Sequence, residues 1–122
     1  GIEEIKDFAY NGCTKLKRVT LGEKFRNFNY QTFQGCQSLT SIDIKKNNRH
    51  YKSIDGILYT ADMKTLIYCP QGKNGIVKIP KSVRYIADYA FYNCNQIETV
   101  IIHKNIKTIG KEAFTGCNTQ QL

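Results

Sequence analysis

The stretch Val83–Ile102, VRYIADYAFYNCNQIETVII, decides the fold, because its pattern occurs four times along the chain. Counted from Cys94, apolar or small residues stand at −11, −8, −4 and −3, and again at +3, +6 and +8. The other copies are centred on Cys13, Cys36 and Cys117, and the spacing is 23 residues from Cys13 to Cys36 and from Cys94 to Cys117. A fixed period in this range is the signature of a solenoid. The sequence therefore predicts coils that stack along an axis.

The central spacing is longer, which indicates an insertion. Cys36 and Cys94 are 58 residues apart, one repeat of 23 plus 35 more, and the extra residues correspond to about 47–76. Within them, an Asp-Gly turn pair and a four-residue loop separate short β-rich runs. We expect an antiparallel β-meander that projects from the solenoid. Its strands are predicted at Tyr51–Ile54, Ile57–Thr60 and Thr65–Cys69.

Each coil is predicted to contain one strand and one helical turn. The residues at +4 to +9 alternate between apolar and polar, which is the period of a half-buried strand, and stacked coils would pair these strands in a parallel sheet. Segments such as Asp88–Phe91 suit a single helical turn that a small residue ends. The aromatic residue at −3 is predicted to stack in the interior, one ring per coil. These rings are Tyr10, Phe33, Phe91 and Phe114.

These features resemble the BspA-like class of leucine-rich repeats. The shared motifs are I-x-x-x-A-F-x-x-C from Ile86 to Cys94 and L-x-x-V-x-I over Ile97–Ile102. The run YKSIDGILYTADMKTLIYCPQGK, which begins at Tyr51, is similar to the interrupted repeat of many such proteins. The resemblance covers almost the whole chain. Departures from the pattern are Tyr10 in place of Phe, Thr32 in place of Ala and Gln120 in place of Leu.

The resemblance implies an α/β solenoid: a curved leucine-rich-repeat stack with short parallel strands on the concave face and short helical turns on the convex face. We expect one domain, residues 1–122, as a fragment of a longer protein. Members of the class are mostly large surface or secreted proteins of mucosal bacteria and of protists, with roles in adhesion. The resemblance therefore implies an extracellular or cell-surface location and no enzymatic activity of the repeat itself.

The charge is strongly positive but dispersed. The net charge is +8, from 18 basic and 10 acidic residues, and no run of five like charges occurs. Dispersed charge is typical of a solvated face, and the alternative is weak attraction to acidic glycans or acidic proteins. No nucleic-acid-binding motif accompanies the charge, and no apolar run is long enough for a membrane span. We predict a protein or acidic glycan partner, no nucleic acid, no membrane insertion of this chain, and self-association through exposed coil ends.

The cysteines and histidines indicate structure rather than chemistry. Four of the five cysteines share one repeat position and Cys69 lies in the insertion, without the spacing of a metal site. We predict that the four are small buried hydrophobes; coils about 5 Å apart would also permit a bridge between neighbours. His50 and His103 stand in no nucleophile or metal motif. The chain is predicted to have no cofactor, no metal and no catalytic residue.

Two groups of residues are candidate ligand-binding positions, and each has a simpler alternative. The first group points outward from the repeat strands, where the alternative is an ordinary solvated face. The second consists of tyrosines of the insertion, where the alternative is that the rings pack onto the coil beneath. The leading function is a surface-displayed binding module for adhesion or protein recognition; the alternatives are a structural spacer and an intracellular scaffold. The first group is Arg18, Thr20, Asp43, Lys45, Lys78, Ile101 and His103, and the second is Tyr51, Tyr59 and Tyr68.

Overall fold

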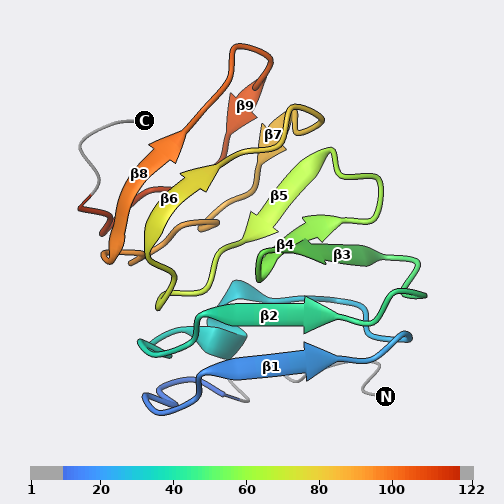
Figure 1. Cartoon of the computed structure of the whole chain (residues 1–122), viewed down its shortest axis with the longest axis vertical. Helices are drawn as coiled ribbons and strands as arrows, with labels where there is room; N and C mark the ends of the chain where they lie inside the picture. The colour runs from blue at the N-terminus through green and yellow to red at the C-terminus, as the bar shows by residue number, and fades with distance from the viewer. Residues whose placement is uncertain (1–9, 119–122) are drawn as a thin grey trace.

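A computed structural model of the chain describes residues 10–118, and the coils follow one another along the long axis of the molecule (Figure 1). Within that range the elements are short strands connected by turns. The described elements are β1 (Arg18–Leu21), η1, a 3₁₀ helix (Tyr30–Phe33), β2 (Ser41–Ile44), β3 (Tyr51–Ile54), β4 (Ile57–Thr60), β5 (Thr65–Tyr68), β6 (Gly75–Lys78), β7 (Tyr85–Ile86), β8 (Ile97–Ile101) and β9 (Thr108–Ile109).

The predicted stack of 23-residue coils is confirmed by strand pairing. β1 pairs with β2 in parallel, and β6 pairs with β8 in parallel. Val19 lies opposite Ile42 and Val77 lies opposite Val100, so residues one repeat apart become neighbours. Ile42, Val77 and Val100 are buried, which leaves the alternate residues of these strands on the outside.

The four repeat strands form two separate pairs and not the one parallel sheet that the spacing predicted. The turn between β3 and β4 lies against β2, where the N–H of Ile42 donates to the carbonyl of Gly56 at 2.9 Å. The loop between β5 and β6 lies against the segment before β2, where the N–H of Gly72 donates to the carbonyl of Leu39 at 2.7 Å. A Cβ at Gly56 would lie 2.8 Å from the Cα of Ser41, and one at Gly72 would lie 2.6 Å from the oxygen of Leu39. The two glycines therefore allow the insertion to occupy the place beside β2.

The insertion is an antiparallel meander, as predicted, but the prediction that it projects from the solenoid is wrong. β3 pairs with β4 and β4 with β5 in antiparallel fashion. Leu58 and Tyr59 of β4 are 0 % and 2 % exposed and belong to two different core clusters, one toward the N-terminal coils and one toward the C-terminal coils. Successive side chains of a strand point in opposite directions. Because both directions lead to apolar interior here, the meander lies between the two halves of the stack.

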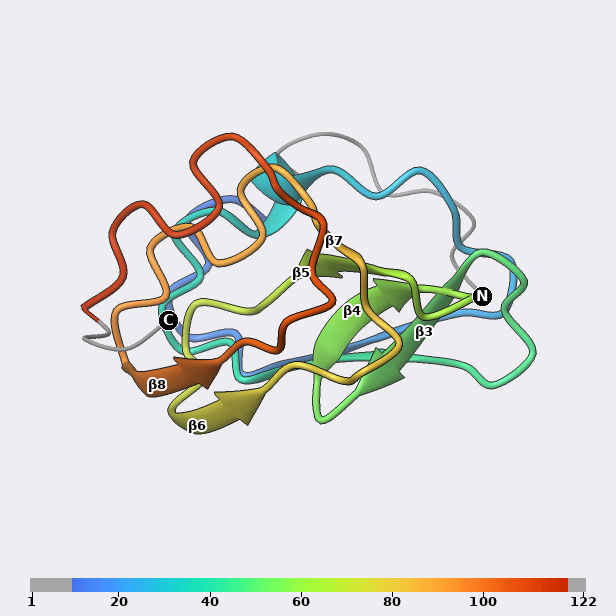
Figure 2. The ribbon, with the colours of Figure 1, turned by 90° about the horizontal axis from the view of Figure 1, so that it is seen from above.

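The meander also begins a second ladder of strands. β5 pairs in parallel with β7, and β7 pairs in parallel with β9. Figure 2 shows β6 and β8 on a different side of the coils from β5 and β7. The solenoid therefore has two strand faces over its C-terminal half, and the repeat strands β6 and β8 form only one of them.

Helical turns on the side opposite the repeat strands were predicted, and this prediction is wrong: within residues 10–118 the structure has only η1. The N–H groups of Tyr89, Phe91 and Asn93 donate to carbonyls of the next coil at 2.7–3.0 Å. The N–H groups between them bond within the turn, and Tyr89 and Asn93 have φ angles of 61° and 57°. A helix would keep every N–H in its own segment. The hydrogen bonds between coils thus exclude a helix.

The predicted aromatic stack is confirmed within each pair of coils. The rings of Phe91 and Phe114 stack with centroids 5.0 Å apart, and those of Tyr10 and Phe33 stack at 5.6 Å. The ring of Phe33 next stacks on that of Phe28, with centroids 6.2 Å apart, so the aromatic row does not continue straight across the meander. The aromatic stack therefore consists of two segments, one in each core cluster.

The prediction that the four repeat cysteines are buried is confirmed for Cys36 and Cys94, whereas Cys117 is only partly buried and Cys13 is exposed. The thiols of Cys36 and Cys117 donate to carbonyls of the preceding coil, to Tyr10 at 2.9 Å and to Phe91 at 3.0 Å. Burial raises the pKa of the Cys117 thiol to about 11. All five cysteines are free thiols.

Candidate binding surfaces

Three of the first four predicted ligand-binding residues lie on β1 and β2, and the fourth, Lys45, directly follows β2. Arg18 and Thr20 lie on β1, opposite Ser41 and Asp43 of β2. The Nε of Arg18 donates to Oδ2 of Asp43 at 2.8 Å. Lys45 follows β2 with an exposed side chain, and its backbone N–H donates to the carbonyl of Leu21 at 3.0 Å. The structure thus brings these four residues together on one surface.

The charge of Asp43 is stabilised by its neighbours. Partial burial raises the pKa of this carboxyl, but hydrogen bonds from Arg18 and Ser41 and the charge of Arg18 outweigh the burial, so its pKa lies below the usual value. Asp43 therefore stays ionised at neutral pH. Because 70 % of the Arg18 side chain is exposed, the pair orients two charges at the surface more than it stabilises the fold.

A polar hollow of about 470 Å³ adjoins this ion pair. Its far wall comes from the meander and from the loop that precedes β6. There the ammonium of Lys73 donates to the carbonyl of Asp55 at 2.6 Å. The hollow is open and lined with hydroxyl, carboxylate, amide and ammonium groups, which suits polar recognition. Its lining residues are Arg18, Thr40, Ser41, Asp43, Ser53, Asp55, Gly56, Lys73 and Asn74.

The outer faces of β6 and β8 differ from those of β1 and β2, because they are partly apolar. Ile76 is 65 % exposed and Ile101 is 44 % exposed. Lys78 lies opposite Ile101, and Ile76 lies opposite Thr99. The two isoleucines lie diagonally on adjacent strands and point away from the core, so they give this outer face its apolar character.

His103 lies beside this face but is engaged by the backbone. Its Nδ1 accepts a hydrogen bond from the N–H of Asn105 at 3.1 Å, so the ring hydrogen resides on Nε2, which donates to the carbonyl of Pro80 at 2.9 Å. The Nε2 bond joins the loop after β8 to the preceding coil, and the Nδ1 bond is made within that loop. The role that the structure gives to His103 is positioning of the loop after β8.

The tyrosines of the meander follow the simpler alternative and pack inside. Tyr59 and Tyr68 are 2 % and 1 % exposed, and burial raises the pKa of both phenols. Tyr51 is half-buried, and its hydroxyl accepts the N–H of Phe28 at 2.9 Å. These residues join the meander to the coil beneath and do not form an exposed site.

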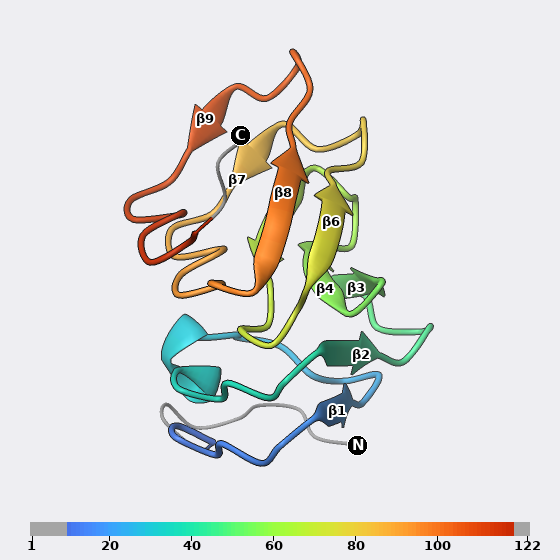
Figure 3. The ribbon, with the colours of Figure 1, turned by 60° about the vertical axis from the view of Figure 1, so that its left-hand side comes forward.

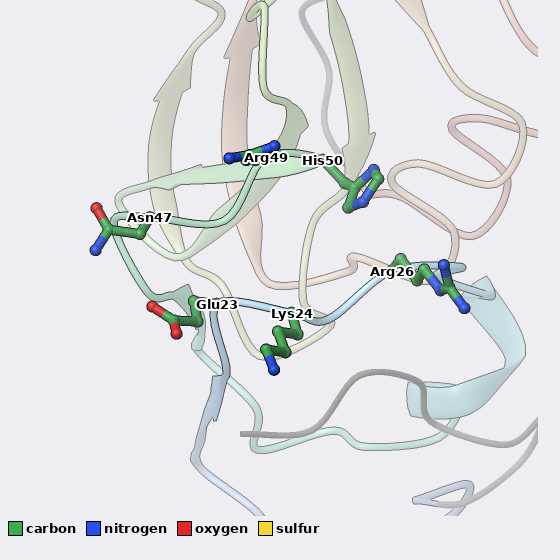
Figure 4. Close-up of a pocket in the computed structure, with 6 residues that line it drawn as sticks. All are labelled: Glu23, Lys24, Arg26, Asn47, Arg49 and His50. Atoms are coloured by element: carbon green, nitrogen blue, oxygen red, sulfur yellow. The ribbon is translucent and has the colours of Figure 1, made fainter.

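Two surface features lay outside the predicted residues. Tyr30, Tyr89 and Tyr92 form an aromatic cluster, in which the rings of Tyr30 and Tyr89 stack at 3.9 Å and Tyr92 meets both at a steep angle. The cluster joins the coil of Cys36 to the coil of Cys94, past the meander. The other feature is a basic hollow at the ends of the loops that follow β1 and β2 (Figure 4). Repeat spacing could have indicated it, because Arg26 and Arg49 are 23 residues apart.

Neither a metal centre nor a membrane-spanning helix occurs in the described part of the chain. No three histidine, cysteine or acidic side chains among residues 10–118 are grouped as metal ligands. Over the same residues, no helix has the length and apolar character needed to cross a bilayer.

Comparison with known proteins identifies the repeat. The family model described as BspA type leucine-rich repeat region matches residues 1–60 and 68–122, in six copies. No curated protein matches the sequence.

Three solved structures are similar to the chain over most of its length. A leucine-rich cell surface protein of Faecalibacterium prausnitzii A2-165 is 26 % identical with a TM-score of 0.79, over 98 % of this chain and 32 % of that chain. The pneumococcal vaccine antigen PcpA is 28 % identical with a TM-score of 0.75, over 83 % of this chain and 25 % of that chain. A leucine-rich repeat protein of Eubacterium ventriosum is 24 % identical with a TM-score of 0.76, over 83 % of this chain and 27 % of that chain. At this identity the similarity concerns the fold alone.

The chain spans about a quarter to a third of the length of these structures. The family model, by contrast, matches nearly every residue, including the coils on both sides of the meander. The stacked 23-residue coils and this match agree, and the chain belongs to the BspA-type leucine-rich repeat family.

Proposed function

We propose that the chain is a non-catalytic binding module of a surface-displayed protein and that it recognises a protein partner through the outer faces of its repeat strands. The observation that carries the proposal is the exposed isoleucine pair Ile76 and Ile101, with Lys78 beside it. Protein interfaces combine an apolar centre with a polar rim. The polar hollow beside Arg18 and Asp43 supplies the rim on the neighbouring strand pair.

The arrangement of the strands supports a single contact area. β1, β2, β6 and β8 face the same side of the molecule in Figure 3, with β6 and β8 steeply inclined to β1 and β2. The amide of Gln96, just before β8, donates to the carbonyl of Gln37, just before β2, at 3.2 Å. A partner that covers both pairs would contact two surfaces of different character. The surface location is supported by the family and by the structural neighbours, one described as a cell surface protein and one as a vaccine antigen.

The test measures binding of the purified chain to immobilised extracellular-matrix proteins at physiological salt. The double variant Ile76→Ser, Ile101→Ser removes the apolar pair and is expected to weaken binding at least about tenfold. The matched control is Ile54→Ser, Tyr85→Ser, because these apolar side chains are also exposed, at 41 % and 40 %, but lie on β3 and β7. The control is expected to bind as the parent chain does.

The charged part of the surface has its own variants. Charge reversal of Arg18, Lys45 and Lys78 is expected to reduce the association rate, because rim charges steer encounter more than they hold a complex. If no matrix protein binds, or if the control weakens binding as much as the double isoleucine variant does, the recognition proposal fails and the chain serves as a spacer.

A further inference from the structure

The basic hollow is formed by two loops that lie one coil apart. The first follows β1 and carries Glu23, Lys24 and Arg26; the second follows β2 and carries Asn47, Arg49 and His50 (Figure 4). Because the loops occupy the same place in successive coils, Arg26 and Arg49 hold the same repeat position. The placing of an arginine on each of the two loops, at equivalent backbone positions one coil apart, is therefore a direct consequence of the repeat.

Asn48 fixes the two loops to each other from inside. This residue is 8 % exposed, and its side-chain amide donates to the carbonyls of Gly22 and Phe25 at 3.0 and 2.8 Å. Its side-chain oxygen accepts the N–H groups of His50 and Tyr51 at 2.7 and 2.9 Å. All four hydrogen-bonding positions of the Asn48 side chain are used. The backbone beneath the basic side chains is thus held in place before any ligand arrives.

The hollow has a volume of about 510 Å³ and an excess of positive charge. Of its six lining residues, Lys24, Arg26 and Arg49 are cationic, His50 adds an imidazole, and Glu23 is the one carboxylate. All of these side chains are exposed. Among residues 10–118, no carboxylate forms a salt bridge with Lys24, Arg26 or Arg49. These charges are available to an external anion.

We propose that this hollow is a binding site for a sulfated polysaccharide, separate from the protein-binding surface. The cations are spaced along two loops of an open hollow, which matches a chain of repeated anionic groups better than one small anion. The guanidinium group of arginine can bind a sulfate group through two parallel hydrogen bonds. Because Asn48 already fixes the loops, binding costs little conformational entropy of the backbone. That the ligand is a glycan and not a nucleic acid rests on the cell-surface location in the proposed function. That an anionic ligand binds at this place rests on the basic hollow alone.

The test measures affinity for a heparin oligosaccharide by calorimetry at about 150 mM salt. The triple variant Lys24→Ala, Arg26→Ala, Arg49→Ala is expected to bind about tenfold to a hundredfold more weakly, because it loses three ion pairs with the ligand. Its salt dependence should also become shallower, since fewer counterions are displaced. The matched control Lys104→Ala, Lys107→Ala, Lys111→Ala removes the same charge from exposed positions at the other end and is expected to leave affinity within about threefold.

A second variant is expected to act in the opposite direction. Glu23→Gln removes the carboxylate of the hollow, so heparin affinity should rise about twofold to threefold, which loss of folding cannot imitate. Equal weakening by both triple variants would show attraction by net charge alone and would overturn the site. Equally tight binding of single-stranded DNA or polyglutamate would overturn the assignment to sulfated glycans. Either result leaves the isoleucine test of protein recognition unaffected.

Discussion

Individual side chains couple neighbouring coils through backbone groups about one repeat away. The hydroxyl of Thr40 donates to the carbonyl of Lys17, and Asp88 accepts the N–H of Lys111 at 2.7 Å. The thiols of the repeat cysteines and the amide of Asn48 act in the same way. A small polar group at a fixed repeat position thus adds a hydrogen bond between coils; the carbonyl of Lys17, for example, also accepts the backbone N–H of Thr40.

Two tyrosines of the meander differ in how well their hydroxyl groups are bonded, and this difference is testable. Within the described residues the buried hydroxyl of Tyr68 has no hydrogen-bond partner, whereas that of Tyr51 accepts the N–H of Phe28. Tyr68→Phe is therefore expected to be neutral or to stabilise the fold by up to about 1 kcal/mol, and Tyr51→Phe to cost about 1 kcal/mol. Denaturant unfolding of both variants is the measurement, and the opposite ranking would contradict the assigned bonds.

The residue-level predictions from sequence succeeded where a residue's role repeats. The stacking of Phe91 on Phe114 and the burial of Cys36 and Cys94 follow from a period of 23. The three tyrosines of the insertion had no repeat to place them, and only their burial in the structure separates packing from recognition. The structure likewise gives His103 a backbone-holding role that no sequence motif signals.

Among the elements, the turns opposite the repeat strands were the least predictable. A segment such as Asp88–Phe91 has residues that a helical turn accepts, and local preference alone favours that conformation. In the structure, every second N–H group of this turn instead donates to a carbonyl of the next coil. The local sequence gives no signal of these hydrogen bonds between coils. Tertiary hydrogen bonding decided the conformation against the weaker local propensity.

The contact of the meander with the second coil depends on Gly72, and an added methyl group tests it. In Gly72→Ala the new Cβ would meet backbone atoms of Ser38 and Leu39 at less than 3.0 Å, and these cannot move without disturbing the coil. The expected cost is about 2 to 4 kcal/mol in the free energy of unfolding. Gly75→Ala is the control, because open space surrounds it and only its φ of +75° is strained, at about 1 kcal/mol. Equal costs for the two variants would contradict the close docking.

For the molecule as a whole, the sequence predicted the stack but not its division. The order of coils and the pairing of β1 with β2 and of β6 with β8 follow from the period. The division into two core clusters depends on β4, whose successive side chains enter different clusters. An insertion without a repeat gives no signal of whether it projects or is buried, since apolar residues suit both a meander face and an interior layer.

The end of the second ladder offers an edge for self-association. β9 pairs with β7, and within the described residues no strand pairs with its other side. Ile109 of this strand is 51 % exposed. Because an open edge with apolar side chains favours pairing between molecules, the chain is expected to dimerise as its concentration rises, and Ile109→Lys to prevent this. Sedimentation velocity over a concentration series is the measurement; a parent chain that stays monomeric at the highest concentration would contradict the prediction.

The buried meander determines how the two strand pairs are oriented, since it separates β2 from β6. The repeat alone would carry each strand to the next by the same small rotation, and every coil would then face nearly the same way. With β3–β5 in between, β6 and β8 run in a different direction from β1 and β2 (Figure 1), although the sequences of their coils stay regular. Within a longer array, each such interruption would act as a bend, and the number and position of the bends would decide the path of the whole array and which partners it can enclose.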